Sequence, residues 1–161
     1  MYLIDSDVFI DAKNRHYPFD VVPAFWDWIV RAHRTGRVFT VQKVAEEVLA
    51  GGDELATWMR AQPASFRLLP GSADQVSMQM VSQWANGAGY TQAAVAAFLQ
   101  AGDYFLVAQA LTLRYIVVTH ETPDPQARRR IKIPDACKAV GVQWMTPFEM
   151  LRTENARFTL L

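Results

Sequence analysis

Hydrophobic runs alternate with helical patterns through most of the chain. The runs at residues 2–4, 38–41, 66–69, 115–118 and 142–145 are dominated by apolar side chains, which is typical of strands buried on both faces of a parallel sheet. Between these runs, apolar residues recur three and four positions apart, which indicates amphipathic helices. The alternation predicts an α/β fold in which helices pack against a mainly parallel, doubly wound sheet.

The expected helices begin and end at residues that commonly cap helices. They lie between Val22 and Gly36, at residues 42–50, 54–61, 91–99 and 103–113, after Ser72, after Pro134 and from Pro147. The helix after Ser72 is opened by a capping-box pattern, and its expected buried face consists of Val76, Met80, Val81 and Trp84. Residues 12–20 and 122–132 are expected to be loops.

Composition narrows the class of protein. The chain has 161 residues, of which 51% are hydrophobic and 20% charged, so we expect one globular domain over residues 1–161. The formal net charge is zero, so nucleic-acid binding would depend on local basic clusters or on metal ions. Cys137 is the only cysteine, which excludes an intrachain disulfide. No apolar stretch has the length of a membrane span, and no basic region precedes the first apolar run, so a cytoplasmic protein is expected.

Acidic side chains lie at four places where they could meet. Asp5, accompanied by Asp7, follows the first strand, and Glu121 follows the strand at 115–118. Glu47 lies on the helix after the second strand, and Asp103 opens a helix after a glycine. Strand ends converge on one edge of a doubly wound sheet, so these groups could share a cleft. Clustered carboxylates repel one another unless a cation or proton lies between them, and a bound divalent cation can support phosphodiester cleavage.

The four acidic segments resemble, in the same order, those of the PIN domain, a compact α/β nuclease family. The matching segments are LIDSDVFI at residues 3–10, VAEEVLAG at 44–51, GDYFLVAQA at 102–110 and IVVTHE at 116–121. Together they span most of the chain. The resemblance implies a three-layer α/β/α sandwich with a mainly parallel central sheet.

The resemblance also implies an activity and a set of site residues. The catalytic acids would be Asp5, Glu47 rather than Glu46, Asp103 and Glu121. Asp5, Asp103 and Glu121 would bind Mg²⁺ or Mn²⁺, and Glu47 would act through water. Ser6, Asp7 and Thr119 would support the ligands by hydrogen bonds. Many small bacterial PIN proteins are toxins, so the implied partners are an RNA substrate, an antitoxin protein and a second copy in a homodimer, with no membrane.

Two features depart from the family pattern. The fourth acid is usually Asp or Asn, whereas Glu121 is longer by one methylene group. Residues 128–137 are not part of the general pattern and look like those of a PIN-like subgroup of undefined function. Asp135 in that segment is therefore a rival to Glu121 for the fourth position.

Two surfaces are expected to contact partners. Arg128, Arg129, Arg130 and Lys132 follow the strand that carries Glu121, so they are expected at the rim of the site, where they could bind RNA phosphates. The alternative is a solvated loop, or one paired with nearby acids such as Glu121. An antitoxin is expected to cover the cleft or the helical surface around three tryptophans, Trp26, Trp28 and Trp58.

Other readings of the same residues remain open. The motif Asp5-Ser6-Asp7 also matches the opening of haloacid-dehalogenase-type phosphatases, but in that family the strand ending in Thr or Ser precedes the Gly-Asp segment, and here the order is reversed. A PIN-like module without catalytic activity could instead bind RNA or a partner. The three histidines, His16, His33 and His120, have no paired spacing of the kind that binds zinc, and only His120 is expected beside the cleft.

Overall fold

A five-stranded parallel sheet forms the centre of the molecule. The computed structural model describes residues 1–160. The strands lie in the order β3-β2-β1-β4-β5, and every neighbouring pair is parallel. Their bounds are Tyr2–Ile4 for β1, Val38–Val41 for β2, Arg67–Leu68 for β3, Ile116–Val118 for β4 and Trp144–Met145 for β5. The predicted parallel sheet is therefore confirmed, and all strands end at the same edge.

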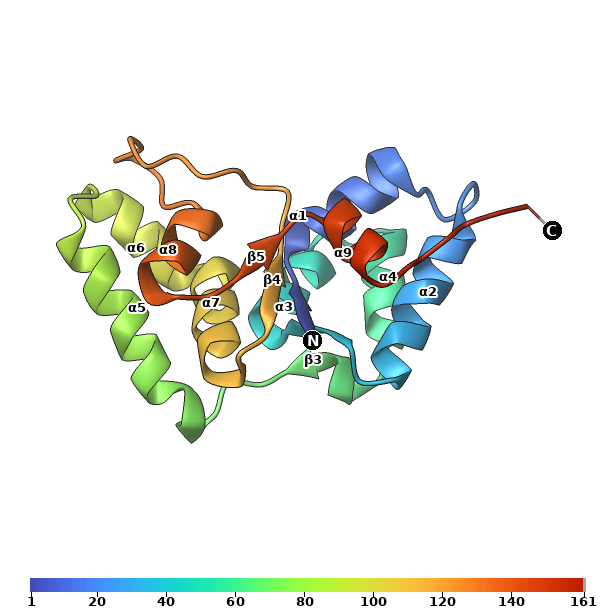
Figure 1. Ribbon diagram of the computed structural model, residues 1–161, viewed down its shortest axis with the longest axis horizontal. Helices are drawn as coiled ribbons and strands as arrows, with labels where there is room; N and C mark the ends of the chain where they lie inside the picture. The colour runs from blue at the N-terminus through green and yellow to red at the C-terminus, as the bar shows by residue number, and fades with distance from the viewer. Residues whose placement is uncertain (161) are drawn as a thin grey trace.

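Helices cover both faces of this sheet. One layer contains α5 (Gln75–Gly87), α6 (Gln92–Gln100), α7 (Gly102–Leu113) and α8 (Ile133–Val140) (Figure 1). The other side carries α1 (Ser6–Asp11), the π-helix η1 (Ala12–His16), α2 (Pro23–Arg34), α4 (Glu54–Ala61) and α9 (Pro147–Thr153). Helix α3 (Gln42–Ala50) follows β2 directly, and the short 3₁₀ helices are η2 (Ala64–Phe66) and η3 (Ser72–Asp74).

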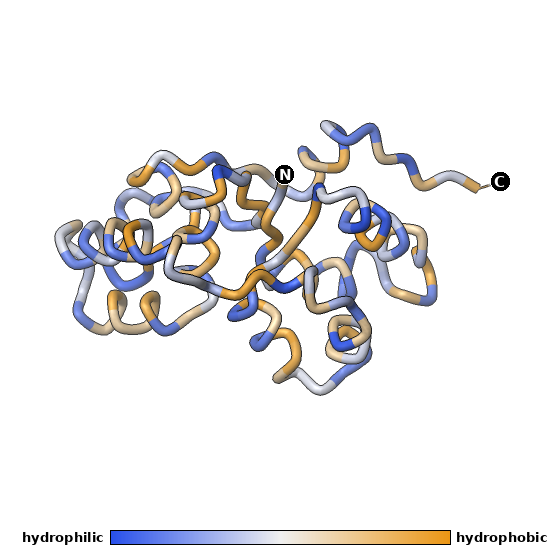
Figure 2. Tube along the Cα trace, turned by 90° about the horizontal axis from the view of Figure 1, so that it is seen from below, coloured by the Kyte–Doolittle hydropathy of each residue, from blue (hydrophilic) through white to orange (hydrophobic). Residues whose placement is uncertain are grey.

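The core has two parts because consecutive residues of a strand face opposite sides of the sheet. Ile4 packs with Phe9 and Phe25 on one side, and Leu3 packs with Leu106 on the other. Strand β1 is thus buried on both faces, as its unbroken apolar sequence predicts. Figure 2 shows hydrophobic chain segments passing through the middle of the molecule.

The segment after β1 is helical, and the helical part includes residues from 12 onward that the sequence predicts to be a loop. Asp5 caps α1 by accepting a hydrogen bond from the Ser6 backbone amide at 2.7 Å, and the helix continues into η1 as far as His16. The expectation of a loop from residue 12 is therefore wrong for its first part. Phe9 and Ala12 are buried against the core, so tertiary packing stabilises a helix that the polar sequence does not favour.

Helix α5 buries a different face from the one its sequence predicts. Val76 is 69% exposed and Met80 is 47% exposed, whereas Ser77, Val81 and Ala85 are buried. Polar contacts fix this rotation, since Ser77 accepts a hydrogen bond from Thr112 of α7 at 2.8 Å, and Tyr104 donates to the Met78 carbonyl.

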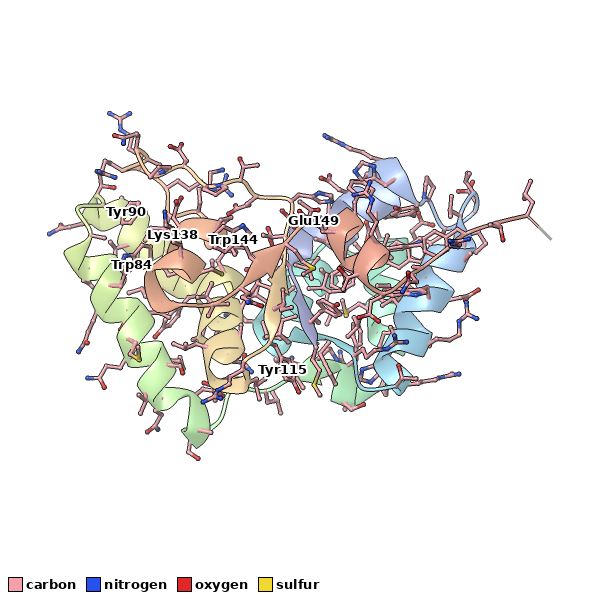
Figure 3. The ribbon with its side chains drawn as sticks, in the orientation of Figure 1. Trp84, Tyr90, Tyr115, Lys138, Trp144 and Glu149 are labelled. Atoms are coloured by element: carbon pink, nitrogen blue, oxygen red, sulfur yellow. The ribbon has the colours of Figure 1, made fainter. Side chains whose placement is uncertain are left out.

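The neighbourhood of α5 differs in two further details. The turn before the helix is closed by the Asp74 carboxylate, which accepts from the Gly71 amide at 2.8 Å, and not by Ser72. Trp84 is half-buried and packs against Tyr90 with ring centroids 5.7 Å apart (Figure 3).

The three tryptophans proposed as an antitoxin surface do not form an exposed patch. Trp26 is 3% exposed, and its ring lies 4.9 Å from that of Trp58. Trp28 and Trp58 are half-buried and pack against the same core, so the helical surface around them consists of side chains that are only partly exposed.

Within residues 1–160, no single helix combines the length and apolarity of a membrane span. Only α6 and α7 taken together do so, across a bend of 67°.

Candidate functional site

Asp5 lies at the carboxyl end of β1, where the backbone and two side chains fix its position. Its amide donates to the Val118 carbonyl at 3.0 Å, which continues the pairing of β1 with β4. Oδ1 accepts from the Ser6 amide, and Oδ2 lies 3.0 Å from the Thr119 hydroxyl. The side chain is only 3% exposed, so its carboxylate is both buried and oriented.

Asp7 lies beside Asp5 and holds the start of the loop after β4. Its Oδ2 accepts from the His120 amide at 3.1 Å and lies 3.2 Å from Thr119 Oγ1. A hydroxyl carries a single proton, so Thr119 can donate to Asp5 or to Asp7 but not to both at once. Thr119 Oγ1 also accepts from the Glu121 amide at 3.1 Å, which ties the next acid to the same point.

Glu47 and Asp103 approach each other where α3 meets the first turn of α7. Glu47 Oε1 accepts a hydrogen bond from the Gly102 amide at 2.6 Å. A Cβ atom on Gly102 would lie 3.0 Å from Glu47 Oε1 and 3.0 Å from Val44 Cγ2. Only glycine allows this approach without displacement, so the Gly-Asp pair places Asp103 next to Glu47 for a steric reason.

The acids act on one another electrostatically. Burial, followed by the negative charges of Glu121 and Glu47, raises the pKa of Asp103 to about 7, although Arg130 opposes the shift. Burial raises the pKa of Asp5 well above its usual range, and the charges of Asp7 and Asp103 add to the shift. Acids from four separate segments therefore lie within electrostatic reach of one another.

Glu121 and Asp135, the two rivals for the fourth position, have different surroundings. Glu121 Oε2 accepts from the Ile133 amide at 2.7 Å, at the start of α8, and Oε1 pairs with Arg130. Asp135 instead accepts from the Asp124 amide at 2.8 Å. Because Glu121 is among the charges that raise the pKa of Asp103, Glu121 is the rival that belongs to the acid cluster.

Only part of the basic loop lies beside the cluster. The loop runs from β4 across the end of the layer that holds α6 and α8 (Figure 1). Arg129 and Arg130 line a cavity of about 150 Å³ together with Asp103. Arg128 donates to the carbonyls of Pro125 and Ala127, within its own loop. Lys132 immediately precedes α8 and is half-buried.

A second small cavity is lined by Glu47. It measures about 180 Å³ and is also lined by Lys13 and Asn14 of η1 and by Asp53. Lys13 forms an ion pair with Asp53, which caps α4 by accepting from the Ala56 amide. Basic side chains therefore line both the cavity at Asp103 and the cavity at Glu47.

Comparison with known proteins places the chain in a family. A family model described as "Domain of unknown function (DUF4411)" matches residues 2–158. The chain belongs to this family. No curated protein matches it.

Two solved structures resemble the DUF4411 chain. One is the structure of FitAB bound to an IR36 DNA fragment, with 18% identity and a TM-score of 0.56 over 92% of this chain and 96% of that chain. The other is the crystal structure of FitAcB from Neisseria gonorrhoeae, with 18% identity and a TM-score of 0.57 over 92% of this chain and 99% of that chain. At this identity the likeness concerns the fold alone. The predicted PIN-like α/β/α fold is confirmed.

The oxygen donors of the acid cluster fit a hard divalent cation. Asp5, Glu47, Asp103 and Glu121 offer only carboxylate oxygens, which suit Mg²⁺ or Mn²⁺ better than softer metals. A cation would also offset the repulsion that raises the pKa values of Asp5 and Asp103.

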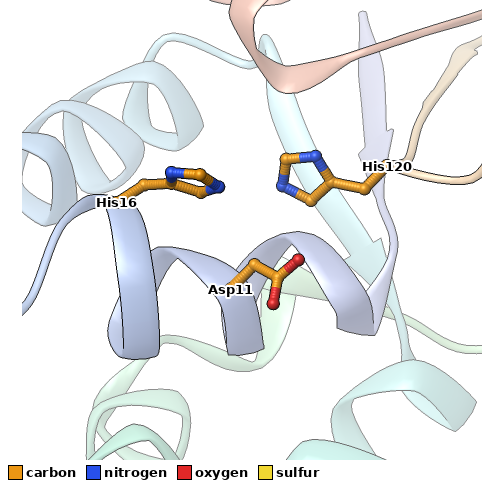
Figure 4. Close-up of side chains that lie close together, drawn as sticks. All are labelled: Asp11, His16 and His120. Atoms are coloured by element: carbon orange, nitrogen blue, oxygen red, sulfur yellow. The ribbon is translucent and has the colours of Figure 1, made fainter.

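A different group of potential metal ligands in the DUF4411 chain has no counterpart among the sequence motifs. Asp11, His16 and His120 offer ligand atoms that all lie within 4.8 Å of one another (Figure 4). The sequence missed this group because His16 and His120 are far apart along the chain. Asp11 and His16 are five residues apart, which is not a spacing that favours contact on an α-helix.

Proposed function

We propose that this DUF4411 chain is a divalent-metal-dependent endoribonuclease and the toxin of a toxin–antitoxin pair. The observation that carries the proposal is the mutual effect of the acids. Burial raises the pKa of Asp103 to about 7 with help from the charges of Glu121 and Glu47, and burial raises that of Asp5 with help from Asp7 and Asp103. A fold that holds such carboxylates together stores a repulsion that a bound cation would relieve.

In this proposal, Asp5 and Asp103 hold the cation directly. The hydrogen bonds from Ser6 and Thr119 fix the orientation of the Asp5 carboxylate without using all of its lone pairs. Glu47 binds the Gly102 amide through Oε1, and Oε2 is assigned to orient the attacking water. When bound, the cation lowers the pKa of that water and stabilises the charge that develops on the phosphate.

Glu121 would bind the cation only after releasing one of its present partners. Both of its oxygens are engaged, one by Arg130 and one by the Ile133 amide. Ligation by Oε1 requires Arg130 to exchange Glu121 for another anion. A substrate phosphate beside Asp103 is a suitable partner, because Arg129 and Arg130 line the cavity at that position. The arginines would then neutralise the substrate while Glu121 becomes available to the metal.

The substrate and partner assignments rest on the resemblance to small bacterial PIN toxins. That resemblance implies single-stranded RNA as the substrate, a cytoplasmic location and an antitoxin protein as the inhibitor. The fold shared with FitAB and FitAcB supports a PIN-like origin. The proposed antitoxin covers the cleft around Asp103 and Arg130 or the helical surface around the half-buried Trp28 and Trp58. A homodimer and a single domain over residues 1–161 complete the proposal.

A specific observation also favours the second candidate, a PIN-like binding module without catalytic activity. Glu121 caps α8 and pairs with Arg130, so it has a structural role that needs no metal. An Asp103 pKa of about 7 also allows that carboxyl to hold a proton near neutral pH in place of a cation. This candidate predicts no RNA cleavage even where Mn²⁺ binds.

The decisive experiment combines Mn²⁺ titration by calorimetry with cleavage of single-stranded RNA in the same buffer. Glu47→Gln should reduce the cleavage rate by about 100-fold or more if Glu47 orients the water. Glu46→Gln is the matched control, because Glu46 is the neighbouring acid and is exposed beside Lys43 and Gln42. Mn²⁺ binding without any cleavage by the wild type would favour the binding module, and equal losses in the two variants would remove Glu47 from the mechanism.

A further inference from the structure

We propose that Asp11, His16 and His120 form a second metal site, separate from the acid cluster, that binds Zn²⁺. One ligand atom from each residue lies within 4.8 Å of the other two, so small side-chain rotations would bring all three to a single ion. Figure 4 shows the two imidazole rings and the carboxylate turned toward a common space. This inference does not depend on the proposed nuclease activity.

The π-helix is the element that brings Asp11 and His16 together. In an α-helix, residues five apart are about 140° apart around the axis and do not share a face. Residues 12–16 form a wider turn, closed by a 2.6 Å hydrogen bond from the Tyr17 amide to the Ala12 carbonyl. π-Helical turns are rare in proteins, and those that occur are often found at functional sites. Here the wide turn carries His16 back toward the carboxylate that precedes it.

Aromatic packing and the backbone place the two imidazole rings. The ring centroid of His16 lies 5.5 Å from that of His120 and 5.3 Å from that of Phe148. Phe148, in the first turn of α9, also lies 6.1 Å from the His120 ring. The amide of His120 donates to Asp7, which fixes the start of the loop. Two of the three ligands are therefore positioned before any ion binds.

The third histidine provides an internal contrast. In His33, Nδ1 lies 3.0 Å from the Val38 carbonyl oxygen and Nε2 lies 3.0 Å from Ser65 Oγ, so its ring is fully used in structural hydrogen bonds. Over residues 1–160, the ring nitrogens of His16 and His120 make no hydrogen bond to protein atoms, while both contribute to the ligand group. The Asp11 carboxylate forms an ion pair at 3.7 Å with Arg15, whose side chain is 73% exposed, and such a pair holds a carboxylate weakly.

The ligand types distinguish this site from the acid cluster. Two imidazoles and one carboxylate are a set that binds Zn²⁺ with one position left open. Imidazole nitrogens favour zinc and other late transition metals, whereas Mg²⁺ prefers oxygen ligands. The two sites should therefore differ in metal preference. An ion on His120 would also connect η1 to the loop that carries Glu121, so Zn²⁺ should stabilise the folded chain by binding it in preference to the unfolded one.

The test uses the full chain with Asp103→Asn, which weakens the acid cluster. Calorimetric titration with Zn²⁺ should still show one bound ion per chain, whereas Mn²⁺ binding should be lost. Adding His16→Gln should weaken Zn²⁺ binding at least about tenfold, as expected for the loss of one of three ligands. Asn14→Gln is the matched control, because Asn14 is an exposed residue of the same π-helix and is not in the ligand group.

A spectroscopic measurement complements the titration and starts from the chain that carries Asp103→Asn alone. Adding His16→Gln should leave the fold intact, because His16 is exposed. Co²⁺ in place of Zn²⁺ should give the visible absorption of a four-coordinate site, and His16→Gln and His120→Gln should each abolish it. The proposal is overturned if Zn²⁺ affinity is the same with and without His16→Gln, or if Co²⁺ gives only the weak spectrum of the hydrated ion. Loss of Mn²⁺ binding with retained Zn²⁺ binding would separate this site from the proposed nuclease centre.

Discussion

Replacing Asp103 by asparagine should stabilise the metal-free protein above neutral pH. The surroundings raise the pKa of Asp103 from 3.8 to about 7, so the folded state binds this proton more tightly than the unfolded state does. The folded state is then favoured at low pH, and this contribution to stability is lost as the pH rises from about 4 to about 7. Above that range, Asp103 in the folded protein carries a negative charge next to Glu121 and Glu47, whereas an asparagine at this position would be neutral.

The size of the effect follows from the shift. A change of about 3 pKa units at 1.36 kcal/mol per unit sets an upper limit of about 4 kcal/mol. Asp103 is partly exposed, so water and salt screen part of the repulsion, and the Asp103→Asn gain above pH 7 should be about 1–2 kcal/mol. For a chain of this length that gain corresponds to a rise in melting temperature of about 2–8 °C.

Thermal unfolding of metal-free wild type and Asp103→Asn between pH 4 and pH 8 measures the difference directly. The free energy of unfolding of Asp103→Asn, relative to that of the wild type, should increase from pH 4 to about pH 7 and then level off. Glu46→Gln is again the matched control, because it removes one negative charge outside the cluster. Added Mn²⁺ should stabilise the wild type and leave Asp103→Asn unchanged. A difference that does not vary with pH, or a variant less stable than the wild type at pH 8, would refute the argument that burial and neighbouring charges disfavour the ionised Asp103.

Two further perturbations test other contacts of the site. Gly102→Ala should reduce RNA cleavage at least about tenfold and also lower the melting temperature, because its Cβ would lie 3.0 Å from Glu47 Oε1 and 3.0 Å from Cγ2 of the buried Val44. A fully active variant would show that the Glu47 contact is dispensable. Binding of single-stranded RNA is measured at several salt concentrations with Ca²⁺ replacing Mg²⁺. The double variant Arg129→Ala and Arg130→Ala should lower the slope of log affinity against log salt concentration by about 1.4, whereas Arg128→Ala should not change that slope. An equal effect of Arg128→Ala would contradict the placement of these side chains.

The sequence by itself determined most of the secondary structure, because its signals are local. Strand Val38–Val41 and helices Gln42–Ala50 and Glu54–Ala61 coincide with their predicted bounds. An unbroken apolar run defines the strand, and glycines or a capping aspartate separate the helices. The order of the acidic segments was also readable, since Asp5 and Glu121 follow strands, Asp103 opens a helix and Glu47 lies on the helix after the second strand.

Tertiary structure decided which side of an element faces inward wherever the apolar pattern was ambiguous. Helix α5 carries apolar residues on more than one side, and its hydrogen bonds to α7 bury Ser77 while Val76 remains exposed. The π-helix has a polar sequence with no local signal for helix, and it forms because Ala12 packs against the core. Local periodicity contains no information about such partners.

The composition of the two candidate sites also depends on the tertiary structure. The sheet order brings β1 and β4 side by side, so Asp5 and Thr119 share a hydrogen bond although they lie at opposite ends of the motif set. The same pairing sets His120 opposite the π-helix and lets Glu121 cap α8. Sequence identifies which residues can do chemistry, but their distances depend on strand order and helix rotation, which arise from contacts between segments far apart in the chain.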